Sequence, residues 1–143
     1  MDQTENLKVE GHKKFVIETD VALIYWEDET NGILLGKIKT DSIITIKDAI
    51  EIVNIYKNNF HCPNRKLLSD VSRLKSLSKE AKDYFSGDNG LFNYFDALAV
   101  ISNSKMEIGS MLVHTILKII PMKKPTRMFY NKAEAIDWLL SFK

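Results

Sequence analysis

The strongest constraint on the fold is the run of five consecutive apolar residues from Ala97 to Ile101. A strand that is apolar on both faces has to be covered on both faces, which is typical of an interior strand in a parallel sheet. Helical patterns precede and follow this run, over residues 79–86 and 105–120. Parallel strands need such crossover helices, and the crossovers are right-handed. We therefore expect an α/β domain, bordering on α+β, with a largely parallel mixed sheet.

The expected elements occur in the order βββαβαβαβα. The first three strands form an antiparallel meander, because short turns separate them and Asn31-Gly32 is a strong hairpin signal. Behind the meander, helices and strands alternate, and residues such as Thr45 and Ser78 cap the helices. The expected strands cover residues 15–18, 21–26, 33–39, 66–70, 97–101 and 126–130, and the expected helices cover residues 46–56, 79–86, 105–120 and 132–142.

The composition indicates one globular domain over residues 1–143, with a flexible or loosely packed N-terminus over residues 1–12. A formal net charge of +1 argues against a dedicated nucleic-acid binder. The single cysteine, Cys62, excludes an intrachain disulfide and suits a reducing compartment. The most apolar stretch, residues 108–122, is too short and too interrupted to span a bilayer. We expect a cytoplasmic protein without a signal peptide or a transmembrane segment.

The sequence contains no convincing catalytic or metal-binding constellation. His61 and Cys62 are adjacent, and adjacent side chains rarely point at each other, so a nucleophile and its base are not expected there. The other histidines are scattered, which leaves no zinc-ligand spacing. The acidic run Glu27–Glu29 lacks the alternating ligands of a calcium loop and is interpreted as a solvated hairpin tip. Asp70 has no second acid or base beside it, and the family resemblance given below implies that it holds the following turn. We expect no enzyme and no cofactor.

Five pieces of the sequence occur in a characteristic order: a strand ending near an aspartate, a capped helix, an apolar strand, a strand behind a proline, and a final helix. These pieces are Leu67–Val71, Ser78–Phe85, Ala97–Val100, Lys124–Phe129 and Glu134–Leu139. Their order and spacing resemble the STAS fold of anti-sigma-factor antagonists, and more specifically the uncharacterised bacterial SpoIIAA-like proteins. The resemblance covers the chain from about residue 33 onward and implies a domain that acts by docking to a protein partner.

In signalling members of the STAS group, a partner kinase phosphorylates a serine in an Asp-Ser-Ser-Gly turn at a helix start. Laid on this sequence from Asp70, that turn falls on Ser78–Ala81, so Lys79 occupies the position of the phosphoserine. Lys79 cannot be phosphorylated, and the resemblance therefore implies a member without the phosphorylation switch. Ser76 and Ser78 lie nearby, but Ser78 is explained as a helix N-cap.

The expected helix over residues 105–120 has more apolar surface than one face of a sheet can cover, because its polar stripe is narrow. The C-terminal helix can cover the excess, or the excess can form a homodimer seam or an apolar ligand site. The candidate interaction surface consists of Met106, Val113, Leu117 and Ile120, together with Trp138 and Phe142 of the last helix.

Basic residues follow this helix, and they suggest contacts with an anionic group. The candidate contacts are Lys118, Lys123, Lys124 and Arg127. Our first hypothesis is a non-catalytic STAS-like interaction or regulatory module, a homodimer with an unknown protein partner. The alternative is a binder of a lipid or another small apolar molecule, at a membrane surface if the basic residues bind head groups. A closed core without a cavity would favour docking over ligand binding.

Overall fold

The structure, a computed structural model, describes residues 3–9, 12–102 and 124–142, with side chains from residue 15 onward. Seven strands form one sheet in the order β1-β2-β3-β4-β6-β8-β9, and β5 and β7 form a separate two-stranded sheet. The strands are β1 Gln3–Val9, β2 His12–Glu18, β3 Ala22–Asp28, β4 Ile33–Ile38, β5 Ser42–Ile44, β6 Lys66–Asp70, β7 Leu74–Leu77, β8 Ala97–Ile101 and β9 Thr126–Phe129. The helices are α1 Ile46–Asn58, α2 Lys79–Ser86, the short 3₁₀ helix η1 Leu91–Asn93, and α4 Lys132–Leu140.

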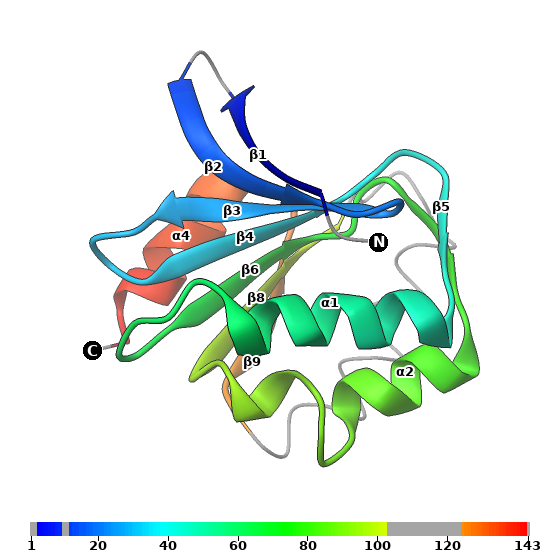
Figure 1. The fold of residues 1–143 in the computed structure, drawn as a ribbon. Helices are drawn as coiled ribbons and strands as arrows, with labels where there is room; N and C mark the ends of the chain where they lie inside the picture. Colours follow the sequence, from blue (N-terminus) through cyan, green and yellow to red (C-terminus); the bar gives the residue numbers. More distant parts are fainter. Residues whose placement is uncertain (1–2, 10–11, 103–123, 143) are drawn as a thin grey trace.

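The main sheet changes from antiparallel to parallel at β4. Strands β1 to β4 pair antiparallel, whereas β4, β6, β8 and β9 pair parallel (Figure 1). This arrangement confirms the expected opening meander and the largely parallel sheet behind it. The described strands and helices also confirm the α/β class.

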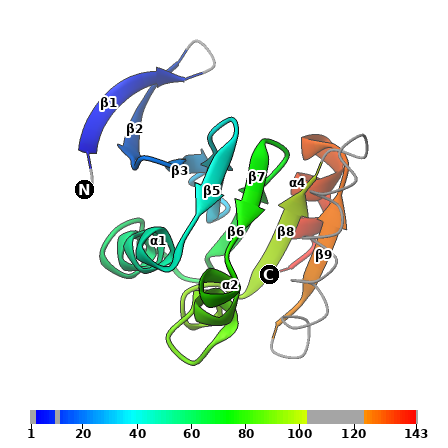
Figure 2. The same ribbon diagram turned by 90° about the vertical axis from the view of Figure 1, so that its right-hand side faces the viewer.

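Two hydrophobic cores lie on opposite faces of the sheet. The helices α1 and α2 cover one face, and α4 covers the other (Figures 1 and 2). Consecutive strand residues face opposite sides, so each interior strand contributes to both cores. The paired residues Leu34, Leu67 and Leu98 lie in the core under α1 and α2, and their neighbours Leu35, Leu68 and Ala99 lie in the core under α4.

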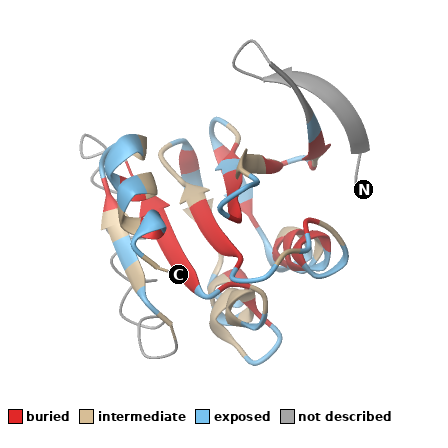
Figure 3. Ribbon diagram, turned by 90° about the vertical axis from the view of Figure 1, so that its left-hand side faces the viewer, coloured by how far each residue is buried: buried red, intermediate tan, exposed pale blue. Residues whose placement is uncertain are grey.

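The apolar run of β8 is buried throughout, as its sequence predicts. All five residues from Ala97 to Ile101 are at most 7% exposed. The interior strands are the most consistently buried part of the molecule, while the outer faces of the helices are exposed (Figure 3). The physical reason is that helices on both faces leave an interior parallel strand no contact with solvent.

Polar side chains start the helices at the expected positions. The Asp48 carboxylate accepts a hydrogen bond from the Thr45 backbone N–H at 3.0 Å, and α1 starts there. The Asn131 side chain accepts a hydrogen bond from the Glu134 N–H at 2.8 Å, and α4 follows. These contacts satisfy N–H groups at or near the helix start that lack intrahelical partners. The expected helix over residues 105–120 lies outside the described residues.

The N-terminal segment contains a strand that was not expected. Residues 3–9 form β1 and pair along their whole length with β2, and the loose packing expected over residues 1–12 stays a prediction. Main-chain hydrogen bonds hold a strand whatever its side chains, so a polar segment can pair without an apolar pattern. The short strands β5 and β7 were also not expected, because three or four residues are too few for a recognisable alternation.

The buried face of α1 matches the expected one only in part, because Ala49, Val53 and Tyr56 are buried as expected. The sequence predicts one apolar stripe that includes Ile46 and Ile50, yet these two side chains are 38% and 39% exposed. The buried residues of α1 are Ala49, Ile52, Val53, Ile55 and Tyr56. Helical spacing identifies an apolar side of the helix, but the neighbouring elements decide which edge of that side is covered.

Candidate functional site: a cavity under α1 and α2

A cavity of about 80 Å³ lies within the core between the sheet and the helices α1 and α2. Its walls are mainly apolar and come from β4, β6 and β8 on the sheet side and from α1 and α2 on the other. Representative lining residues are Ile52, Leu67, Leu77, Phe85 and Leu98. A packed interior has few voids larger than a water molecule. The cavity is therefore a candidate binding site.

Tyr56 places a hydroxyl group at this cavity. Its side chain is only 4% exposed, lines the cavity, and packs edge-on against the Phe95 ring at 5.0 Å between centroids. The hydroxyl lies over Gly36, since a Cβ added at Gly36 would be 2.7 Å from it. Within the part of the chain that the structure describes, this hydroxyl is not among the buried polar atoms that lack a hydrogen-bond partner. Burial raises the pKa of Tyr56 well above its usual value, against the opposing charge of Arg65, so the hydroxyl stays neutral.

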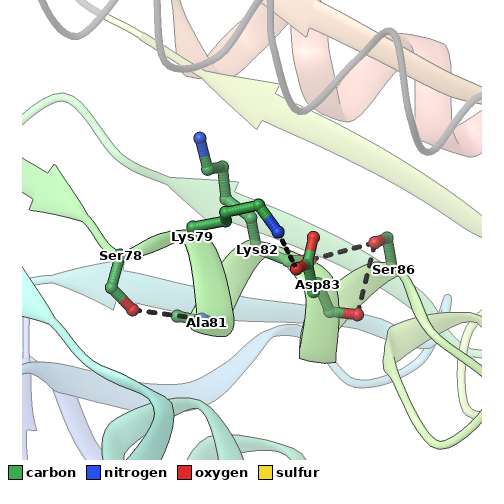
Figure 4. Close-up of polar contacts among 6 residues, drawn as sticks. All are labelled: Ser78, Lys79, Ala81, Lys82, Asp83 and Ser86. Atoms are coloured by element: carbon green, nitrogen blue, oxygen red, sulfur yellow. Dashed lines mark hydrogen bonds and ion pairs between the residues drawn. The ribbon is translucent and has the colours of Figure 1, made fainter.

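Three further polar side chains line the cavity: Ser69, Lys82 and Ser86. The Ser86 hydroxyl donates to the Lys82 carbonyl at 3.0 Å, so it is engaged within α2. Lys82 is half-buried, and among the described residues its ammonium group has no hydrogen-bond or ion-pair partner. Figure 4 shows its side chain directed away from Asp83, the residue that pairs with Lys79. The cavity thus has mainly apolar walls, with Tyr56, Ser69, Lys82 and Ser86 as polar lining residues.

The start of α2 is the position at which the STAS resemblance places a phosphoserine. The Ser78 hydroxyl accepts a hydrogen bond from the Ala81 N–H at 3.1 Å, which confirms its role as the N-cap. Lys79 is the first helical residue, and its ammonium group lies 3.0 Å from the Asp83 carboxylate (Figure 4). Both side chains therefore have structural roles within α2.

We expect Ser78→Ala to lower the free energy of unfolding by about 1 kcal/mol, because the substitution leaves the Ala81 N–H without its acceptor. Ser78→Asp should retain most of the stability, since aspartate is an equally good N-cap. Urea denaturation followed by circular dichroism measures both values. Lys79→Ala is the control and should change stability little, because its ion pair is exposed. Equal stability of Ser78→Ala and the wild type would contradict the capping role.

His61 and Cys62 lie in the loop between α1 and β6, beside the buried Arg65. The Arg65 guanidinium is 6% exposed and donates to the backbone carbonyls of Asn59, Phe60 and Tyr94. Partial burial raises the pKa of the Cys62 thiol, and the positive charges of Arg65 and of the next residue along the chain oppose this only in part. A protonated thiol is a poor nucleophile. This environment favours a structural loop over a catalytic cysteine.

We expect Cys62→Ser and His61→Ala, singly or together, to leave the fold and any binding activity intact. The change in the free energy of unfolding should stay within about 0.5 kcal/mol, as for most surface positions. The wild-type thiol should react with iodoacetamide more slowly than a free cysteine at pH 7.5, because its raised pKa lowers the thiolate fraction. Fast alkylation, or loss of binding without loss of stability, would indicate a reactive site here.

Most of the candidate interaction surface lies outside the described residues: Met106, Val113, Leu117 and Ile120, and the basic residues Lys118 and Lys123. Of the surface, Trp138 and Phe142 are described, and both are partly buried against the core under α4. Their rings lie 4.8 Å apart, and the Trp138 ring also packs on Phe129. The homodimer seam through these elements stays a prediction.

The two described members of the basic group have separate contacts, and their role as anion contacts stays a prediction. The Lys124 ammonium lies 3.7 Å from the Asp96 carboxylate, and the Arg127 guanidinium lies over the Phe129 ring at 5.1 Å. Asp70 accepts hydrogen bonds from the backbone N–H and the hydroxyl of Ser72, which confirms that it holds the turn after β6. Over residues 3–9, 12–102 and 124–142, no three His, Cys, Asp or Glu side chains are placed to hold a metal ion, and no helix is long and apolar enough to cross a membrane.

Sequence reasoning missed the polar groups of the cavity. Tyr56 was placed on the apolar stripe of its helix, and Lys82 had no feature that distinguished it from other helix lysines. Gly36, a glycine inside an apolar strand, was the available signal, because such a glycine often marks a close approach by another group.

The sheet order and the helix layers define a SpoIIAA-like fold of the STAS type. An uncharacterised protein of the DUF3478 family from Shewanella loihica PV-4, described as having a SpoIIAA-like fold, is similar over 97% of this chain and 92% of its own, with a TM-score of 0.54 and 17% sequence identity. An anti-sigma factor antagonist from Mycobacterium paratuberculosis is more distant, with a TM-score of 0.47 and 11% identity over 82% of this chain and 92% of its own.

Residues 25–143 match the family described as "Domain of unknown function (DUF7793)", and the chain belongs to this family. No curated protein matches its sequence. The structural likeness confirms the fold that the sequence resemblance implied.

Proposed function

We propose that this protein is a non-catalytic interaction module that docks an acidic protein partner at one end of the domain. That end, the docking end, consists of β5, β7 and the first turns of α1 and α2, which lie together in Figure 2. The observation that supports the proposal is a group of three exposed isoleucines. Ile43 of β5 is 53% exposed, and Ile46 and Ile50 of α1 are 38% and 39% exposed.

The three isoleucines lie close to one another. Ile46 and Ile50 are one helical turn apart on α1, and Ile43 lies three residues before Ile46. Scattered single apolar side chains are normal on a surface, but neighbouring ones mark contact sites. Lys47 of α1, Lys75 of β7 and Arg73, directly before β7, are exposed positive charges at this end. Positive charge around an apolar centre is complementary to a partner with an acidic rim.

The chemistry of the described side chains supports binding rather than turnover. The Cys62 thiol has a raised pKa, and the neighbouring Arg65 donates to three backbone carbonyls. Ser78 and Lys79 are both engaged within α2. We infer that partner binding at the docking end does not depend on the phosphoserine of signalling STAS proteins.

A photo-crosslinking residue at position 47 identifies the partner in cells, and the same residue at position 137 on α4 is the control. The captured protein is then purified and its affinity measured. Ile50→Lys should weaken binding by at least about tenfold, because a charge enters the apolar centre. Leu140→Lys is matched to it, since Leu140 is 38% exposed on the opposite side of the sheet, and it should leave the affinity unchanged.

Three outcomes would overturn the docking proposal: capture of the same protein from position 137, equal affinities of both variants, or crosslinking only to a second copy of this chain. The last outcome would identify the docking end as a homodimer contact instead.

We expect no stoichiometric phosphorylation at Ser76 or Ser78 in cells, because Lys79 occupies the acceptor position and Ser78 is engaged as a cap. Intact-mass analysis of protein from its native host measures this directly. A major phosphorylated form that maps to either serine would show that the switch is present after all.

The cavity favours a second candidate function, the binding of a small apolar ligand. Its walls are mainly apolar, and a dry cavity of this kind takes up apolar molecules. Xenon is a suitable probe because it has no polar group. Shifts of amide resonances around Leu67 and Leu98 under xenon pressure would support this function, and unchanged spectra would contradict it.

A further inference from the structure

We propose that a pocket on the α4 face of the sheet binds a small monocarboxylate, and that the ammonium group of Lys66 holds its carboxylate. The pocket has a volume of about 350 Å³ and lies between the β3–β4 turn, the loop before β6 and the end of α4. These segments lie on the left in Figure 1, whereas β5 lies on the right. The pocket is therefore remote from the docking end, and it shares no lining residue with the cavity under α1 and α2.

Lys66 carries a buried positive charge without a carboxylate partner among the described residues. It is only 5% exposed. Its ammonium group donates to the backbone carbonyls of Asn64 at 3.2 Å and Asn31 at 3.5 Å, and it makes no ion pair within the part of the chain that the structure describes. An ammonium group has three donors, so one N–H is left over. A buried charge is costly unless an opposite charge and hydrogen bonds compensate it. An anion in the pocket supplies the missing charge and the third acceptor.

The position of the Lys66 ammonium group at this pocket follows from the strand and from its two acceptors. Side chains alternate along a strand, and Lys66 is two residues before Leu68, whose side chain lies in the core under α4. Phe142, which packs against the same core, lines the pocket together with Lys66. The residues whose carbonyls accept from the ammonium group, Asn31 and Asn64, also line the pocket. The ammonium group therefore lies where the two loops meet at the pocket wall.

The charges and the size of the pocket favour a monocarboxylate over other anions. Lys66 has one donor left, and the exposed Glu29 adds a negative charge to the lining. A doubly charged phosphate would be repelled by Glu29 and only half neutralised by one ammonium group. The volume of about 350 Å³ is within the range of small-molecule sites and exceeds the roughly 150 Å³ that hold a benzene ring. An apolar body can contact Leu140 and Phe142 of the wall.

Titration of the full chain with phenylacetate, followed by amide chemical shifts, tests the inference. The uncharged probe is 2-phenylethanol, which has the same ring, and inorganic phosphate is the competing anion. We expect phenylacetate to bind at least about tenfold more tightly than either, since a hydrogen bond between two charged groups is stronger than a neutral one. The largest shifts should occur at the amides of Gly32 and Asn64, which line the pocket. Lys66→Met should remove the preference for the carboxylate over the alcohol.

Lys37→Met is the matched control, because Lys37 is an exposed lysine of the neighbouring strand β4 and does not line the pocket, and it should leave all affinities unchanged. If Lys66→Met fails to fold, Lys66→Gln replaces it, since the amide can still donate to the loop carbonyls but has no charge. Equal affinities for phenylacetate and the alcohol, tighter binding of phosphate, a carboxylate preference that survives the loss of Lys66, or no binding of phenylacetate to the folded protein would each overturn the inference.

Discussion

Replacing Arg65 with alanine should lower the free energy of unfolding by about 3–5 kcal/mol. The guanidinium of Arg65 is buried and donates to the carbonyls of Asn59 and Phe60, at the end of α1, and of Tyr94, after η1. It also lies over the Phe95 ring at 4.8 Å. Without it, three carbonyls lose their donor, and the end of α1 loses its connection to η1. Urea denaturation of the purified variant measures the change.

Arg73→Ala is the control for this experiment, because Arg73 is exposed and its side chain makes no hydrogen bond or ion pair with the described residues. Its substitution should change stability by less than about 0.5 kcal/mol. Arg65→Lys should fall between the wild type and the alanine variant, since one ammonium group cannot reproduce the planar set of donors. A loss below about 1 kcal/mol for Arg65→Ala would show that water replaces the guanidinium at these carbonyls.

Replacing Gly90 with alanine should lower the free energy of unfolding by about 3 kcal/mol, at the upper end for an overpacked site. A Cβ at Gly90 would lie 2.1 Å from the Phe85 carbonyl oxygen and 2.6 Å from the Tyr84 carbonyl oxygen. Both are backbone atoms, so the end of α2 or the following turn has to move. Hydrogen exchange should show faster opening of the last turn of α2, in addition to the global loss measured in urea.

Asn89→Ala is the matched control, one residue earlier in the same turn and exposed. It should leave stability within about 0.5 kcal/mol of the wild type. A Gly90→Ala variant as stable as Asn89→Ala would show that the turn between α2 and η1 accommodates a side chain without strain.

Local patterns predicted the element types well because their signals are short-range. Thr45, Ser78 and Asn131 were expected to cap helices, and α1, α2 and α4 start at these residues. The interior strand β8 follows directly from its five apolar residues. The two short strands β5 and β7 were not predicted. They pair with each other although they lie about 30 residues apart, so their own composition gives no signal of the pairing.

The candidate site could be predicted only in part. The position of Lys79 at the start of α2 follows from counting residues after Asp70, and the structure has Lys79 as the first residue of α2. The exposed isoleucines of α1 could not be predicted, because Ile46 and Ile50 follow the same helical spacing as buried residues. Their exposure, 38% and 39%, depends on which side of α1 the rest of the packed domain covers.

The sequence by itself determined the class of fold, the starts of the helices and the buried strand Ala97–Ile101. These features depend on neighbours within a few residues, where steric preference and hydrogen bonding act directly. Only the tertiary structure decided that Tyr56 lies over Gly36, that Lys82 borders a cavity and that Arg65 connects α1 to η1. Those contacts join elements that are distant in the chain, and the close packing of helices against the sheet brings them together.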